Sequence, residues 1–182
     1  MKVSQKVMCL SSVLLSVYSV SAAAVSDNTI SFEGEVTAQT CTVLVNGQAS
    51  PVVLLPTVST EDLKTAGTTA GTTSFEFNVS GCTTSDEAST IGAKFTGNAV
   101  DTSTAGAGTL GNTGTATNVN IQLLDSASAP IDLNSTWTGK GDIALAAESA
   151  VATQTYYARY FATGAAAAGT VKASVQYALN YQ

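Results

Sequence analysis

The stretch SVQYALNYQ, residues 174–182, decides the fold class of this sequence. Apolar side chains occupy every second position of it: Val175, Tyr177, Leu179 and Tyr181. Successive side chains of a β-strand point to opposite faces, so this pattern predicts a strand with one apolar face. Domains commonly end in loose, polar residues. A strand this regular at such a place therefore points to a specific task for it.

Strand patterns of the same kind recur along the chain, and helix patterns are rare. Alternation, or a short apolar run between turn residues, predicts strands at residues 29–36, 41–45, 51–56, 74–82, 91–95, 118–125, 129–133, 155–161 and 170–181. Two Thr/Gly/Ala-rich stretches, 65–73 and 101–118, are predicted to be surface loops. Only residues 59–67 favour a short helical turn, with Ser59 or Thr60 as its cap. Many short strands separated by turn residues are typical of an all-β sandwich.

The first 23 residues have the organisation of a secretory signal peptide. Lys2 and Lys6 precede an apolar run at 7–20, which leads into small residues. The run is too short to span a membrane and carries several serines. We therefore expect residues 1–23 to be removed, with an N-terminal extension at 24–37 and a single domain at 38–182.

The charge balance of the remaining chain restricts its partners. Without Lys2 and Lys6, five basic residues stand against thirteen acidic ones, a net charge near −8. Such a surface repels the phosphate backbone of nucleic acids, so we expect no nucleic-acid partner.

Two cysteines follow the signal peptide, Cys41 and Cys82. An even number of cysteines in an exported chain favours a disulfide, and the loop-entropy relation gives such a bridge roughly 4 kcal/mol of stabilisation. A metal site is the rival interpretation, but the sequence has no histidine and no closely spaced pair of cysteines. We therefore expect a disulfide between these residues and no metal or other cofactor.

Patterns that would indicate an enzyme are weak. Without histidine or a free cysteine, the common pairs of nucleophile and base cannot form. Gly106, Gly108 and Gly111 match the spacing of a dinucleotide fingerprint. That fingerprint requires a strand before the glycines and a helix after them, and the sequence on either side has neither pattern. We therefore expect no enzymatic activity.

Aromatic residues could instead form a platform for sugars. Trp137 and the cluster Tyr156, Tyr157, Tyr160 and Phe161 are the candidates. Alternation in this cluster places Tyr156 and Tyr160 on one face of a strand. An ordinary strand of the hydrophobic core would show the same alternation as a sugar-binding face. The core interpretation is preferred.

The sequence has an alternating strand pattern near its N-terminus and another at its C-terminus, and the two suggest a way for subunits to pair. Ile30, Phe32, Gly34 and Val36 form one face of ISFEGEV, residues 30–36. A long apolar edge strand invites pairing with another chain. An economical arrangement lets the N-terminal strand of one subunit complete the sheet of the next by strand addition.

These features together resemble the major subunits of chaperone–usher fimbriae, and among them the type 1 pilin in particular. The resemblance covers nearly the whole chain after residue 23. It includes the apolar-x-apolar-x-Gly-x-apolar pattern of residues 30–36, the spacing of Cys41 and Cys82, a penultimate Tyr181, and Gly169 fourteenth from the end.

The resemblance implies an incomplete immunoglobulin-like β-sandwich that a strand donated by the neighbouring subunit completes. The donor residues would be Ile30, Phe32, Gly34 and Val36. The acceptor groove and chaperone contact would involve Gly169, Val175, Tyr177, Leu179, Tyr181 and Gln182. Implied partners are identical subunits in a helical homopolymer, a periplasmic chaperone, an outer-membrane usher, and adaptor or adhesin subunits.

The implied function is that of a structural subunit of a bacterial surface fimbria that supports adhesion, exported through the periplasm. The alternatives are a minor adaptor or a small tip adhesin. Such two-domain adhesins would need an additional lectin domain ahead of the pilin domain, which this length does not accommodate.

Overall fold

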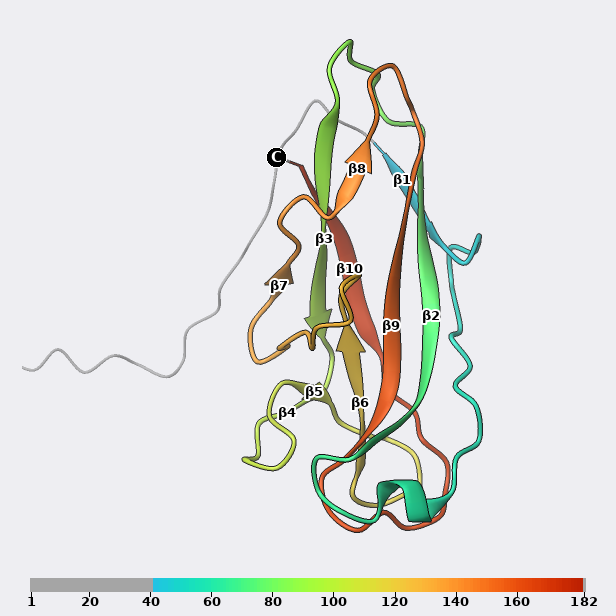
Figure 1. Cartoon of the computed structure of the whole chain (residues 1–182), viewed down its shortest axis with the longest axis vertical. Coiled ribbons are helices and arrows are strands. Elements are labelled where there is room, and N and C mark those ends of the chain that lie inside the picture. The colour runs from blue at the N-terminus through green and yellow to red at the C-terminus, as the bar shows by residue number, and fades with distance from the viewer. Residues whose placement is uncertain (1–40, 182) are drawn as a thin grey trace, which may run out of the picture. The chain divides into compact units, whose positions relative to one another are not determined.

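The computed structural model describes residues 41–181, and within them the chain forms two antiparallel β-sheets (Figure 1). The strands are β1 (Thr42–Val45), β2 (Thr69–Ser80), β3 (Ser89–Gly97), β4 (Val100–Asp101), β5 (Thr109–Leu110), β6 (Val119–Leu124), β7 (Trp137–Thr138), β8 (Ile143–Leu145), β9 (Ala152–Ala162) and β10 (Val175–Tyr181). A single-turn 3-10 helix, η1, spans Thr60–Leu63. No helix in this part of the chain is long and apolar enough to cross a membrane.

The larger sheet has the strand order β1-β2-β9-β6-β5-β4, and the smaller one has the order β10-β3-β7, with β8 also paired to β3. β10 therefore lies at an edge of the smaller sheet. Its register on β3 runs from Val175 opposite Gly97 to Tyr181 opposite Ile91. The predicted final strand is confirmed from Val175 to Tyr181 and is wrong for residues 170–174, which do not form a strand. Its apolar parity is confirmed, because Val175, Tyr177, Leu179 and Tyr181 all pack against the core.

Aromatic rings from both sheets hold the sandwich together. Phe77 of β2 meets Phe95 of β3 at a centroid distance of 5.5 Å and Tyr177 of β10 at 5.1 Å. Tyr156 of β9 contacts Phe95 edge-on at 5.3 Å and is fully buried. Trp137 stacks on Phe95 at 5.7 Å. Tilted and edge-on rings at these distances are favourable beyond the area they bury. The interpretation of the aromatic cluster as core is thus confirmed for Tyr156.

Two predicted strands do not form. At residues 129–133 only one bridge is found, between Leu124 and Pro130. Pro130 has no N–H to donate, and the segment then turns so that the N–H of Leu133 bonds to the carbonyl of Gly108 at 3.1 Å. Residues 51–56 also lack strand pairing, although their side chains alternate between exposed and half-buried. The physical reason is that no neighbouring strand lies beside them among the described residues.

The local predictions around η1 hold in part. Ser59 caps the helix and forms a capping box with Asp62, as the helical-turn prediction at 59–67 anticipated. The loop predicted at 65–73 is wrong from residue 69 onward, because β2 begins there, with a bulge between Ala70 and Thr73. The loop predicted at 101–118 contains β5, whose Thr109 and Leu110 are buried. Pairing with β4 and β6, which sequence periodicity does not reveal, orders this stretch.

Candidate functional site

An apolar groove of about 690 Å³ opens between the two sheets. Its lining residues are Val45, Pro51, Val52, Val53, Leu54, Leu55, Phe75, Phe77, Phe95, Leu110, Ile121, Leu123, Ala158, Tyr160, Val171, Lys172, Ala173, Ser174, Val175 and Tyr177. The aromatic and aliphatic members from the strands are core residues and form its floor. Segments 51–55 and 171–177 form its two walls. A groove with this composition is suited to an extended apolar partner rather than to polar chemistry.

The first wall is the unpaired stretch between β1 and η1, drawn as a plain coil in Figure 1. Its backbone makes no hydrogen bond with any other described residue from 51 to 58. Val53 and Leu55 pack against the core, whereas Val52 and Leu54 are 74% and 81% exposed. Residues 51–56 thus have the side-chain alternation of a strand and a free backbone edge.

The second wall is the segment that leads into β10. Its even-numbered residues bond away from the groove. The carbonyls of Thr170, Lys172 and Ser174 accept hydrogen bonds from the N–H groups of Ala116 (3.0 Å), Thr113 (2.8 Å) and Asn98 (3.4 Å). Backbone groups of successive strand residues point to opposite edges. Val171 and Ala173 therefore turn their N–H and C=O groups toward the groove, and neither bonds to the backbone of another described residue.

Residues 112–116 hold this second wall in place. The Asn112 side chain accepts a hydrogen bond from the Lys172 N–H at 2.9 Å and donates to the Ala116 carbonyl at 2.8 Å. Thr115 and Thr170 bond to each other through side chain and backbone. The wall is therefore held to the body of the domain by several hydrogen bonds.

The predicted groove residues lie in different places. Val175 and Tyr177 line the groove, and Leu179 and Tyr181 pack on the core farther along β10. Gly169 lies ahead of the wall, where a Cβ atom would come within 2.4 Å of the backbone nitrogen of Ala116. The predicted signal peptide, the donor residues Ile30, Phe32, Gly34 and Val36, and Gln182 lie outside the described residues.

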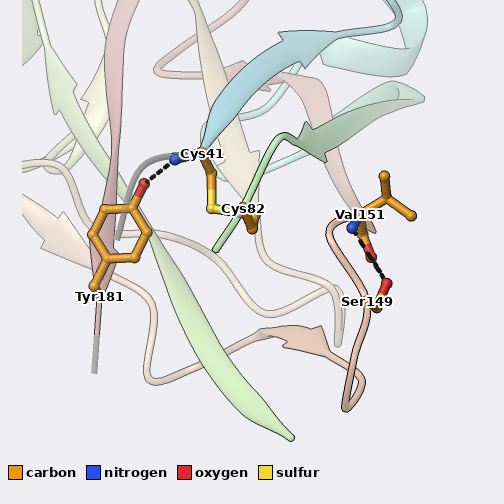
Figure 2. Close-up of a disulfide and its surroundings, with 5 residues drawn as sticks. All are labelled: Cys41, Cys82, Ser149, Val151 and Tyr181. Carbon is orange, nitrogen blue, oxygen red and sulfur yellow. Dashed lines mark hydrogen bonds between the residues drawn. A yellow bond between two sulfur atoms is a disulfide. The ribbon is translucent and has the colours of Figure 1, made fainter. Parts of the chain in front are cut away.

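The predicted disulfide between Cys41 and Cys82 is present, with the Cα atoms 4.3 Å apart. Figure 2 shows the ring of Tyr181 beside it, with its phenol oxygen pointing at Cys41. The N–H of Cys41 donates to that oxygen at 3.0 Å. On the other side, the N–H of Cys82 bonds to the carbonyl of Ala150 at 3.2 Å. The bridge thus lies where the ends of β1, β2 and β10 meet.

A polar cluster lies away from the groove, around the hydroxyl of Tyr156. That hydroxyl donates to the carboxylate of Asp142, which also accepts from the N–H of Ala93 at 3.3 Å. Burial, followed by the bond to Asp142 and the charges of Asp142 and Asp125, raises the pKa of Tyr156 above its usual value. Asp142 thus satisfies a buried hydroxyl, which is a structural role.

Sequence reasoning missed one wall of the groove and its support. Residues 51–56 were expected to be an ordinary paired strand, and residues 112–116 a surface loop. The bounding Pro51 and Pro56 were the available signal for the first, since proline is confined to strand edges and ends. Nothing in the periodicity of residues 112–116 reveals that they support the second wall.

Comparisons with known proteins agree on one family. The fimbrial protein family model matches residues 30–182. The major fimbrial subunit SMF-1 of Stenotrophomonas maltophilia is 36% identical over 88% of this chain and 95% of its own length. The type-1 fimbrial protein A chain of Escherichia coli K12 is 32% identical over 97% of this chain and its own full length. The P pilus rod subunit PapA has the same fold, with a TM-score of 0.58 at 16% identity over 78% of this chain and 99% of its own. The chain therefore belongs to the fimbrial protein family and is a structural subunit of a fimbria.

Proposed function

We propose that this subunit polymerises by donor-strand exchange, in which residues 30–36 of one copy fill the groove of the next. The observation that carries this proposal is a pair of backbone edges, at 51–58 and at 171–173, that lie on either side of an apolar floor and form no backbone pairing with other residues of 41–181. An inserted strand would bond to both edges at once and cover the floor. It would also remove the aggregation hazard that exposed strand edges create.

The sequence of residues 30–36 fits such an insertion only when its apolar face is turned toward the groove. Ile30, Phe32 and Val36 would face the floor, and burying them contributes on the order of 5–8 kcal/mol before ordering costs. A slip by one residue would drive Glu33 and Glu35 into the groove, at a large desolvation cost. Gly34 would lie where a side chain is least tolerated.

We further propose that the subunit reaches the surface through the periplasm, after removal of residues 1–23. Until a neighbouring subunit arrives, the groove needs a temporary partner, and a periplasmic chaperone that lends a strand fits this need. Leu179, Tyr181 and the carboxylate of Gln182 are the proposed chaperone contacts. An outer-membrane usher would then exchange the chaperone for the next subunit. We propose a non-enzymatic structural subunit rather than a minor adaptor or tip adhesin, and the support is a major fimbrial subunit among the relatives named above that matches over nearly its full length.

The test is assembly by Phe32→Asp subunits, with Glu33→Gln as the matched control. The first change places a charge against the apolar floor, so we expect loss of filaments while the folded domain with its Cys41–Cys82 bridge persists. The control removes an outward charge and should assemble nearly normally. Filaments sheared from cells and examined by electron microscopy give the readout. Normal filament length and denaturant resistance in Phe32→Asp cells would refute the donor assignment.

A further inference from the structure

Lys172 is the only charged residue among those that line the groove. Its side chain is exposed, and it takes part in no ion pair within residues 41–181, where the one salt bridge joins Lys64 and Glu61. On the opposite wall the outward side chains, Val52 and Leu54, are apolar. The rim of the groove therefore carries one cation, on the β10 side.

Hydrogen bonds hold the backbone of Lys172 in place. The N–H and the carbonyl of Lys172 both bond to the supporting residues, Asn112 (2.9 Å) and Thr113 (2.8 Å). Its side chain lies on the same face of the segment as the exposed Ser174 and Gln176, and the half-buried Val175 and Tyr177 lie on the opposite face. A strand inserted in the groove would thus meet Lys172 with its outward-facing residues.

The outward face of the proposed donor strand is acidic, with Ser31, Glu33 and Glu35. Both the donor, 30–36, and the wall, 171–177, are seven residues long. When they overlap fully in antiparallel orientation, residue 36 lies opposite 171 and residue 30 opposite 177. Glu35 then lies directly opposite Lys172. Because Lys172 bonds away from the groove, the two form a non-hydrogen-bonded pair, whose Cα atoms are only about 4.5 Å apart.

We propose that the Lys172 ammonium of the acceptor copy pairs with the Glu35 carboxylate of the inserted copy, and that this contact specifies the register of the donor strand. This inference rests on the proposed strand insertion and adds the partner residue. Cross-strand pairs of opposite charge are favourable, and like charges placed opposite each other are not.

Other placements lose either the ion pair or the apolar fit. A fully overlapping parallel strand puts Ser31 opposite Lys172. An antiparallel shift by two residues toward residue 169 puts Glu33 there, but moves Val36 beyond the groove lining. A shift the other way moves Ile30 to Leu179, which does not line the groove either. Full antiparallel overlap alone keeps all four apolar positions over the floor and an acidic residue opposite Lys172.

The placement can be tested by disulfide trapping in filaments assembled by cells. Three double variants combine Lys172→Cys with Glu35→Cys, Ser31→Cys or Glu33→Cys, and the four single variants are controls for mispairing with Cys41 or Cys82. The expected spacing of the first pair lies within the Cα range of disulfides, 4.4–6.8 Å. We expect a ladder of covalent multimers on non-reducing denaturing gels for Glu35→Cys with Lys172→Cys, and little or none for the other two pairs.

The outcomes separate this inference from the function on which it rests. A dominant ladder from the Ser31→Cys or Glu33→Cys pair would overturn the Lys172–Glu35 contact and leave strand insertion standing. Filaments that assemble without a ladder from any of the three pairs would likewise overturn the Lys172–Glu35 contact alone, whereas filaments of normal length from Phe32→Asp subunits would overturn the strand insertion itself.

Charge reversal provides the second measurement and does not depend on introduced cysteines. Lys172→Glu and Glu35→Lys should each speed filament dissociation in urea by about two- to fivefold, the scale of an exposed ion pair. Urea is used because guanidinium is a salt and would screen the contact. The combined variant should return to the wild-type rate. Dissociation as fast as the two single effects multiplied would overturn the pairing.

Discussion

The backbone N–H of Cys41 donates a hydrogen bond of 3.0 Å to the phenol oxygen of Tyr181, across 140 positions of sequence. Cys41 precedes β1 in the larger sheet, and Tyr181 is the final residue of β10 in the smaller one. This bond therefore ties the two sheets together at the disulfide.

Tyr181→Phe should remove this bond and keep the aromatic ring in place. The part-buried Cys41 N–H would lose its partner, so we expect the free energy of unfolding to fall by about 0.5–1.5 kcal/mol. Urea denaturation of the purified chain followed by circular dichroism measures the change. Tyr177→Phe is the matched control, because the structure shows no hydrogen bond from the Tyr177 hydroxyl to another described residue. Equal effects from the two changes would contradict the assigned role of the Tyr181 hydroxyl.

Leu55→Ser and Leu54→Ser test the first wall of the groove with two neighbouring residues of one type. Leu55 packs against the core, whereas Leu54 is 81% exposed. The first change should weaken strand insertion through lost apolar burial, on the order of 1–3 kcal/mol, and the second should have little effect. The urea concentration at which sheared filaments dissociate is the measurement. Indistinguishable midpoints would mean that residues 51–56 are not a wall of the assembly site.

Gly169→Ala should disturb the support of the second wall. The added Cβ would come within 2.4 Å of the Ala116 backbone nitrogen, so the two segments must separate, at a cost of about 1–3 kcal/mol. Gly164→Ala is the control, since its Cβ would meet only the Asn118 side chain, at 3.3 Å. Thermal unfolding of both variants tests this. A midpoint for Gly169→Ala as high as that of the control would show that the close approach is not needed.

Tyr156 should make the fold sensitive to high pH. Its pKa is raised in the folded protein by burial and by Asp142, so the folded state keeps a proton that the unfolded chain releases near pH 10. Stability from this group is complete below pH 10 and declines above it, by at most about 1.4 kcal/mol per pH unit. Urea unfolding should be measured between pH 8 and 11. The free energy of unfolding should fall less steeply with pH for Tyr156→Phe than for Tyr157→Phe, which retains Tyr156. Parallel declines would contradict this role.

Local pattern predicted the elements whose cause is local. The alternation of residues 175–181 and the Ser59 cap were both readable, because each depends on side chains a few positions apart. The walls of the groove could not be predicted to the same extent from the sequence. Residues 51–56 have the pattern of a strand, but whether a strand pairs depends on what lies beside it. The two-residue strands β4, β5 and β7 likewise exist through the strands that pair with them rather than through their own periodicity.

The pairing of β10 with β3 also determines when the site can exist. β10 follows every other strand of the described chain, yet its partner β3 lies some 80 positions earlier. The second groove wall and the ring of Tyr177 over Phe77 therefore arrive last as the chain emerges, and until then the aromatic core stays open on that side. Contacts this distant in sequence form slowly. Until they form, unpaired strand edges and apolar surface remain exposed and prone to aggregation. The order in which the strands become available thus limits the folding of this subunit, in addition to the strength of its final contacts.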